Sequence, residues 1–164
     1  MKLYLVRHAE PVVTGVFLGC RNDVPLKAPP PPLPITVDVV YVSPLRRALE
    51  TAAVIDAPKI IIEDLREIDF GEWGGRSWSE IEQRWPELAE KKSRNWFGIT
   101  PPGGEPWDAF VARVRAALET ILTDRRPKAI VAHGAVNAVI GGLLGGVDPV
   151  YFKQDYGQVN EFDV

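Results

Sequence analysis

Short apolar runs alternate along the chain with longer segments of helical periodicity. Runs rich in Val, Ile and Leu that end at turn residues are typical of buried strands. The predicted strands are residues 2–6, 37–42, 59–62, 128–132 and 158–164. Because strands and helices alternate, we expect an α/β fold: a three-layer sandwich in which helices flank a mostly parallel central sheet.

Amphipathic and capping patterns locate the helices between these strands. The predicted helices are residues 44–55, 77–85, 86–94, 107–123 and 134–144. The most regular of them carries Phe110, Val114 and Leu118 at helical spacing, which predicts one buried face. Ser43 followed by Pro44 is a typical helix start, with the serine as the N-cap and the proline in the first helical position.

A proline-rich segment precedes the second strand. Residues 27–37 include Pro29, Pro30, Pro31, Pro32 and Pro34. An interior proline removes a backbone donor and clashes with the preceding turn, so no helix fits this segment. We predict an extended conformation of the polyproline II type instead.

Composition and charge narrow the class of protein. The chain has 164 residues, 46% of them hydrophobic and 25% charged, which predicts one globular domain over residues 1–164. Its net charge of −3 argues against binding to nucleic acid. No apolar run approaches a membrane span, and Arg7 and His8 interrupt any signal-peptide core, so we expect a cytoplasmic protein without membrane contacts.

The chain has only two histidines, and each follows a predicted strand. His8 ends the first strand, and His133 ends the fourth. Ligands of parallel sheets gather beyond the carboxyl ends of the strands, so we expect the two imidazoles to share one site rather than to cap separate strands. Arg7 precedes His8, and Gly134 begins a helix whose N–H groups favour an anion.

Two further arginines, Arg46 and Arg47, stand near the start of the helix after the second strand. We expect one of them to be a surface charge and the other to serve a ligand, because an arginine at a helix N-terminus opposes the helix dipole. Together with the imidazoles they predict a positive pocket in an acidic chain. Phosphate suits such a pocket, because a guanidinium binds phosphate oxygens in a bidentate manner.

These residue types indicate transfer of a phosphoryl group. A neutral imidazole attacks phosphorus and forms a phosphohistidine, while arginines and a second histidine hold the phosphate oxygens. The leaving alkoxide needs a proton, for which Glu67, Asp69 and Glu72 are equal candidates on chemistry alone. Cys20 is a weak nucleophile candidate, because no arginine-bearing loop of the phosphatase type follows it.

Motifs for metal or nucleotide chemistry are absent from the sequence. It contains no His-x-His, His-Glu-x-x-His or Cys-x-x-Cys spacing and no phosphate-binding or dinucleotide-binding glycine loop. We therefore expect no metal and no cofactor, with a binuclear carboxylate site as the remaining alternative.

Four segments stand in an order typical of one family. They are Leu5-Val-Arg-His-Ala-Glu10, Ser43-Pro-Leu-Arg-Arg-Ala-Leu-Glu-Thr-Ala52, Leu65-Arg-Glu-Ile-Asp-Phe-Gly-Glu-Trp73 and Val131-Ala-His-Gly134. Together they resemble the histidine phosphatase superfamily, also called the phosphoglycerate mutase-like family. This resemblance implies that His8 is the phosphorylated nucleophile and that Glu67 is the general acid. It also implies a phosphate pocket made by Arg7, Arg47, His133 and Gly134.

The resemblance is strongest to α-ribazole phosphatases of cobalamin assembly, on Asp69-Phe-Gly-Glu-Trp73 and Gly19-x-x-x-Asp23-x-Pro-Leu26. It implies a metal-independent phosphomonoester hydrolase that acts on a small-molecule phosphate ester. The alternatives are phosphoryl transfer of the phosphoglycerate mutase type and a weakly active module that binds a phospho-ligand. The mutases are longer and carry a C-terminal tail over the site.

Two features depart from the family pattern. Thr14 stands where many members have an asparagine that touches phosphate, so we expect this contact to be weakened or replaced by a hydroxyl. Residues 27–37 replace a whole helix, so we expect a phosphoglycerate mutase-like fold with that helix shortened or absent. The proline-rich segment, or a second copy of the chain in a homodimer, is then expected to cover the bare sheet face.

Four tryptophans fall in or near the loops expected around the site. They are Trp73, Trp78, Trp96 and Trp107. An aromatic wall of this kind suits a phosphate ester that bears a ring, whereas the alternative is ordinary packing inside the protein.

Overall fold

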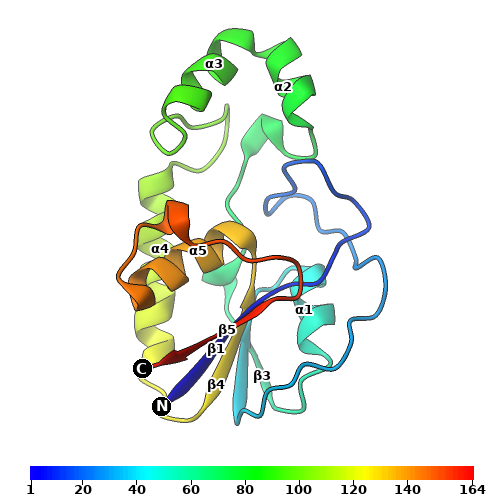
Figure 1. Ribbon diagram of the computed structural model, residues 1–164. Helices are drawn as coiled ribbons and strands as arrows, with labels where there is room; N and C mark the ends of the chain where they lie inside the picture. The colour runs from blue at the N-terminus through cyan, green and yellow to red at the C-terminus, as the bar shows by residue number, and fades with distance from the viewer.

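A five-stranded sheet organises the computed structural model, which describes residues 1–164 (Figure 1). Its strands are β1 (Lys2–Arg7), β2 (Val39–Val42), β3 (Lys59–Ile61), β4 (Lys128–Ala132) and β5 (Val159–Asp163). Their order across the sheet is β3-β2-β4-β1-β5. All neighbours are parallel except β5, which runs antiparallel to β1 at the edge. The predicted α/β fold with a mostly parallel sheet is confirmed.

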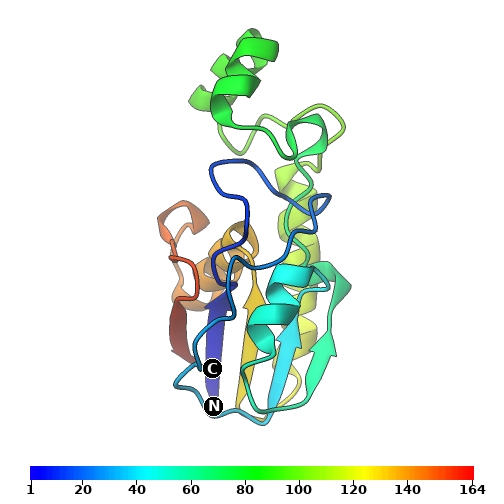
Figure 2. The ribbon, with the colours of Figure 1, turned by 90° about the vertical axis from the view of Figure 1, so that its right-hand side faces the viewer.

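Helices cover both faces of this sheet, as the turned view in Figure 2 makes clear. Helices α4 (Trp107–Leu122) and α5 (Gly134–Gly145) pack on one face, and α1 (Arg46–Ala52) packs on the other. Strand β4 is buried throughout, because its alternate residues face the two helical layers. None of the helices combines the length and the apolar character that crossing a membrane requires.

The start of α1 differs from the prediction. The helix begins at Arg46, its N-cap is Leu45, and no side chain caps it. Ser43 is not the N-cap, because its hydroxyl lies 2.7 Å from the ring nitrogen Nε2 of His133 on the neighbouring strand end. The predicted N-cap and the first helical position of Pro44 are therefore wrong, and a tertiary contact has taken the place of the local one.

The proline-rich segment contains no helix, as its composition predicts. Leu33, Ile35 and Val37 point inward in alternation and pack with α1 against the same sheet face. The intervening Pro34 and Thr36 are exposed. An extended strip with inward residues at every second position thus covers part of the face where relatives of the family were expected to carry a helix.

A pair of short helices projects beyond the carboxyl edge of the parallel strands (Figures 1 and 2). These helices are α2 (Trp78–Arg84) and α3 (Pro86–Arg94), and Ser77 caps the first of them in a reciprocal capping box with Glu80. Trp73 is buried beneath the pair in a small cluster of its own, against which Trp78 packs. These two tryptophans therefore pack inside the protein and do not form an aromatic wall for a ligand.

Candidate active site

The pairing of β1 with β4 places the two histidines next to each other. Arg7 and Ala132 are partners in the parallel register, so the residues that follow them leave the sheet at the same point. The rings of His8 and His133 lie 5.2 Å apart, centroid to centroid, and both side chains are buried. The two strand ends therefore form one site, as the sequence predicts.

Burial keeps His8 neutral, and a contact with Ala9, which opposes the pKa shift, fixes which ring nitrogen carries the proton. Its Nδ1 atom lies 2.8 Å from the carbonyl oxygen of Ala9, which accepts but does not donate, so Nδ1 carries the proton. Burial lowers the pKa of His8 to about 3, and the positive charges of Arg47 and Arg7 act in the same direction. At neutral pH the Nε2 lone pair is therefore available as a nucleophile.

Ser43 sets the orientation of His133. The hydroxyl oxygen accepts a hydrogen bond from the backbone N–H of Leu45 at 3.3 Å and lies 2.7 Å from Nε2 of His133. The hydroxyl can donate to Nε2, and in the tautomer that accepts this hydrogen bond the proton of the neutral ring is on Nδ1. That Nδ1 is buried and has no partner within the chain, so in this tautomer it is a donor available to an anion. Burial keeps the pKa of His133 well below its usual range.

Two guanidiniums stand beside the imidazoles. Arg47 is buried and donates to the backbone oxygens of Asn22 (3.0 Å) and Gly19 (2.9 Å). Arg7 donates to the backbone oxygen of Gln154 at 2.6 Å. The Nε atoms of both arginines are buried without a partner. Loop carbonyls thus fix the positions of these two cations and leave donors unused.

Arg46 is a surface charge, which is the role that the sequence predicts for one of the two arginines. Its guanidinium is exposed and forms an ion pair with Glu50, with Nε and Oε1 2.6 Å apart. The one-residue offset on a helix separates a surface cation from a buried one, because successive side chains point about 100° apart.

Of the three candidate carboxyl groups, only Glu67 reaches the site. Its oxygens accept hydrogen bonds from the backbone N–H groups of Ile68 (3.0 Å) and Ala135 (3.1 Å). Burial raises the pKa of Glu67 above its ordinary value, although these bonds and the nearby arginines oppose the shift. Asp69 instead pairs with Arg21, and Glu72 is exposed.

The convergent groups surround a cavity of about 180 Å³. Its lining includes Arg7, His8, Arg47, Glu67, Gly134 and Tyr156. Neither Thr14, which is exposed, nor His133, which is fully buried, is among the residues that line this cavity, and the contact of Thr14 with phosphate stays a prediction. The N–H groups at the start of α5 were expected to favour an anion, but the N–H of Ala135 donates to the carboxyl group of Glu67.

No three His, Cys, Asp or Glu side chains cluster in a way that would hold a metal ion. The chemistry available at the cavity is that of a nucleophilic imidazole, two guanidiniums with unused donors, and a carboxyl group able to carry a proton.

The C-terminal loop supplies residues that sequence reasoning missed. The Tyr156 ring lies under the Arg7 guanidinium, and the ring centroid is 4.2 Å from the Cζ atom of Arg7. The backbone N–H of Gly157 donates to the oxygens of Arg7 and His8, and Gln154 donates to the oxygen of Leu5. No local pattern marks these long-range contacts. Ser43 did carry a signal, since it follows a predicted strand at the same sheet edge as the histidines.

Comparison with known proteins adds an independent line of evidence. The family model described as "Histidine phosphatase superfamily (branch 1)" matches residues 33–164. An adenosylcobalamin/alpha-ribazole phosphatase of Salmonella typhimurium is 29% identical over 171 residues, which cover 88% of this chain and 80% of that protein. The crystal structure of the alpha-ribazole phosphatase from Shigella flexneri superimposes with a TM-score of 0.82 at 27% identity, covering 100% of this chain and 91% of that one.

A third relative is only partly matched. A bifunctional protein of Mycobacterium tuberculosis is 38% identical over 93 residues, which cover 52% of this chain and 24% of that protein. The chain thus spans about a quarter of the length of this relative.

Replacement of Ser43 tests how the site binds an anion. Ser43→Ala removes the hydroxyl that holds His133, so the affinity for inorganic phosphate should fall about tenfold, the equivalent of one hydrogen bond. Isothermal titration calorimetry measures this affinity, and Ser79→Ala on the surface of α2 is the matched control. An unchanged affinity in Ser43→Ala would show that Ser43 does not position His133 for anion binding.

The low pKa of His8 predicts a fold that is sensitive to acid. The unfolded chain takes up a proton near pH 6.5 and the folded chain only near pH 3, so the free energy of unfolding falls as the pH drops through this interval. Between pH 7 and pH 5 this one residue accounts for a loss of about 2 kcal/mol. In urea unfolding, His8→Gln should lose about 2 kcal/mol less than wild type over that range. Equal losses contradict a neutral, buried His8.

Proposed function

Because the chain belongs to branch 1 of the histidine phosphatase superfamily, we propose that it is a metal-independent phosphomonoesterase that works through a phosphohistidine on His8. The observation that carries this proposal is the state of His8: a buried, neutral imidazole whose Nε2 is free, beside Arg7 and Arg47. Such an imidazole is a competent nucleophile, and the two cations attract the group that it attacks.

In the first step, Nε2 of His8 attacks the phosphorus atom, and the bond between phosphorus and the ester oxygen breaks. Arg7, Arg47 and His133 donate hydrogen bonds to the other phosphate oxygens as charge develops on them. The leaving alkoxide takes the proton of Glu67, whose raised pKa favours the protonated form.

In the second step, water attacks phosphorus, and the bond between phosphorus and Nε2 breaks. The Glu67 carboxylate, left by the first step, accepts a proton from this water. Phosphate leaves, and His8 returns to its neutral state. One carboxyl group therefore acts first as general acid and then as general base.

We further propose α-ribazole phosphate, in cobalamin biosynthesis, as the substrate. Support comes from the likeness to the Salmonella typhimurium and Shigella flexneri phosphatases over most of the chain. A phosphoglycerate mutase would use the same phosphohistidine but pass the phosphoryl group to a second alcohol instead of water. A coupled assay primed with 2,3-bisphosphoglycerate separates these two fates.

Replacement of the nucleophile tests the proposal directly. His8→Ala should abolish release of p-nitrophenol from p-nitrophenyl phosphate and the base-stable, acid-labile phosphoenzyme that alkaline quenching traps in wild type. Cys20→Ser is the matched control and should retain both, as should wild type treated with EDTA. Loss of activity to EDTA, or a trapped phosphoenzyme in His8→Ala, would refute a metal-independent reaction on His8.

Replacement of Glu67 tests its role as the acid. Glu67→Gln should lower kcat/KM for alkyl phosphates about 100-fold, but lower it far less for p-nitrophenyl phosphate, because p-nitrophenolate hardly needs a proton. Glu72→Gln, at an exposed carboxyl group outside the cavity, should change neither rate. Equal losses on both substrates in Glu67→Gln would exclude Glu67 as the proton donor.

A further inference from the structure

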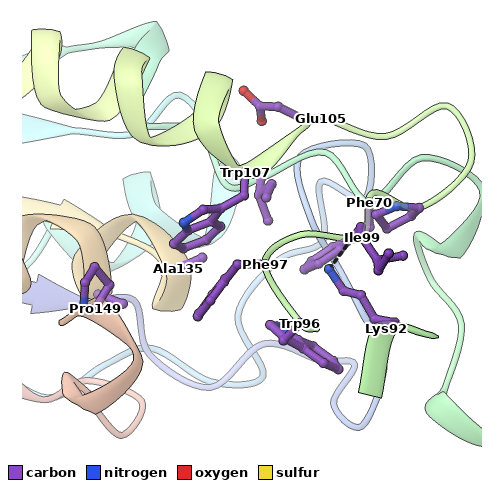
Figure 3. Close-up of a pocket in the computed structure, with 12 residues that line it drawn as sticks. Phe70, Lys92, Trp96, Phe97, Ile99, Glu105, Trp107, Ala135 and Pro149 are labelled. Carbon is purple, nitrogen blue, oxygen red and sulfur yellow. Dashed lines mark hydrogen bonds between the residues drawn. The ribbon is translucent and has the colours of Figure 1, made fainter. Parts of the chain in front are cut away.

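A second cavity lies beside the active-site cavity and is mostly apolar. It has a volume of about 120 Å³, and eight of its twelve lining residues are hydrophobic. Figure 3 shows Trp107 and Phe97 on one side of it and Phe70 and Ile99 on the other. The volume is similar to that of the roughly 150 Å³ apolar cavities that bind benzene.

The second cavity borders the residues around the proton donor. Phe70 lines both of them. The second cavity is also lined by Ile68, which follows Glu67, and by Ala135, whose backbone N–H donates to Glu67. These residues place the second cavity on the Glu67 side of the active-site cavity.

Aromatic side chains give the second cavity its chemistry. The rings of Phe97 and Trp107 lie 4.2 Å apart, centroid to centroid, and form one wall. Trp96 also lines the cavity, and 41% of its surface stays exposed. Part of its surface is therefore open to a ligand. Flat aromatic walls around a small space favour a flat apolar guest.

The charged residues around the second cavity do not favour a charged ligand. Glu105 is paired with Arg113 through contacts of 2.7 and 2.9 Å, and its carboxylate points away from the aromatic rings (Figure 3). Lys92 donates to the backbone oxygen of Ile99 at 2.7 Å and lies 5.0 Å from the Trp96 ring. This amine disfavours a cationic ring, so a neutral one fits best.

We propose that this second cavity is the subsite for the leaving alcohol, and that it selects phosphate esters whose alcohol carries a flat, uncharged apolar ring. The inference rests on the proposed phosphomonoesterase function. It extends that function by assigning the ring to Trp96, Phe97 and Trp107, whereas Trp73 and Trp78 pack elsewhere.

The experiment compares two substrates that differ only in a ring. Wild type should hydrolyse 3-phenylpropyl phosphate with a kcat/KM about 10- to 100-fold above that for propyl phosphate, as burial of one aromatic ring predicts. Both alcohols are equally poor leaving groups, so the ratio of the two kcat/KM values reports the subsite and not the chemistry.

Filling the cavity tests its location. Ala138 lines the cavity from α5, three residues after Ala135, and Ala138→Phe places a ring where the substrate ring would lie. The ratio should fall close to one in this variant. Ala112→Phe, on the exposed side of α4, is the matched control and should keep the wild-type ratio. Trp96→Ala, at a half-exposed position, should lower the ratio at least threefold.

The outcomes separate the inference from the function on which it rests. A wild-type ratio near one, with phosphate released from both esters, overturns the subsite and leaves the phosphomonoesterase intact. A high ratio that survives in Ala138→Phe and Trp96→Ala overturns the location. If wild type releases phosphate from neither ester nor from p-nitrophenyl phosphate, the function itself fails.

Discussion

The parallel pairing of β1 with β4 is the constraint on which the site depends. Because Arg7 pairs with Ala132, the two chains leave the sheet in step, and His8 and His133 emerge side by side. A shift of one residue in this register would turn one of the imidazoles to the opposite face. The buried core on both sides of β4 prevents that shift, so the packing of apolar side chains determines where the imidazoles meet.

Burial then determines how the site reacts. Water is excluded from the strand ends, which keeps both imidazoles neutral and raises the pKa of Glu67. The same burial would be costly for two guanidiniums, so carbonyl oxygens of the loops around Gly19 and Gln154 accept their hydrogen bonds. The site is therefore suited to an anion. It keeps unused donors and two positive charges, and Glu67 is the one carboxyl group that reaches it.

The departures from the family pattern lie away from this chemistry. The strip around Leu33 and Ile35 covers the sheet face beside α1, whereas the histidines emerge at the carboxyl edge. The apolar cavity belongs to a different part of the chain, between α5 and the loops next to α3 and α4. The reacting groups and the apolar cavity thus come largely from different segments of the chain.

Periodicity and a few chemically distinctive residues were sufficient to predict the sheet, the helices and the meeting of the two histidines, because strand ends in a parallel sheet converge whatever the details of packing. Three points required the tertiary structure. Residue chemistry left Glu67, Asp69 and Glu72 open, and although the family resemblance favoured Glu67, the burial of its carboxyl group at the site is a result of packing. Ser43 could be a helix cap or a partner of His133, and a contact between residues 90 positions apart decided it. Tyr156 lines the cavity and Thr14 does not. The path of each loop depends on residues that are distant in sequence, and no local pattern encodes those contacts.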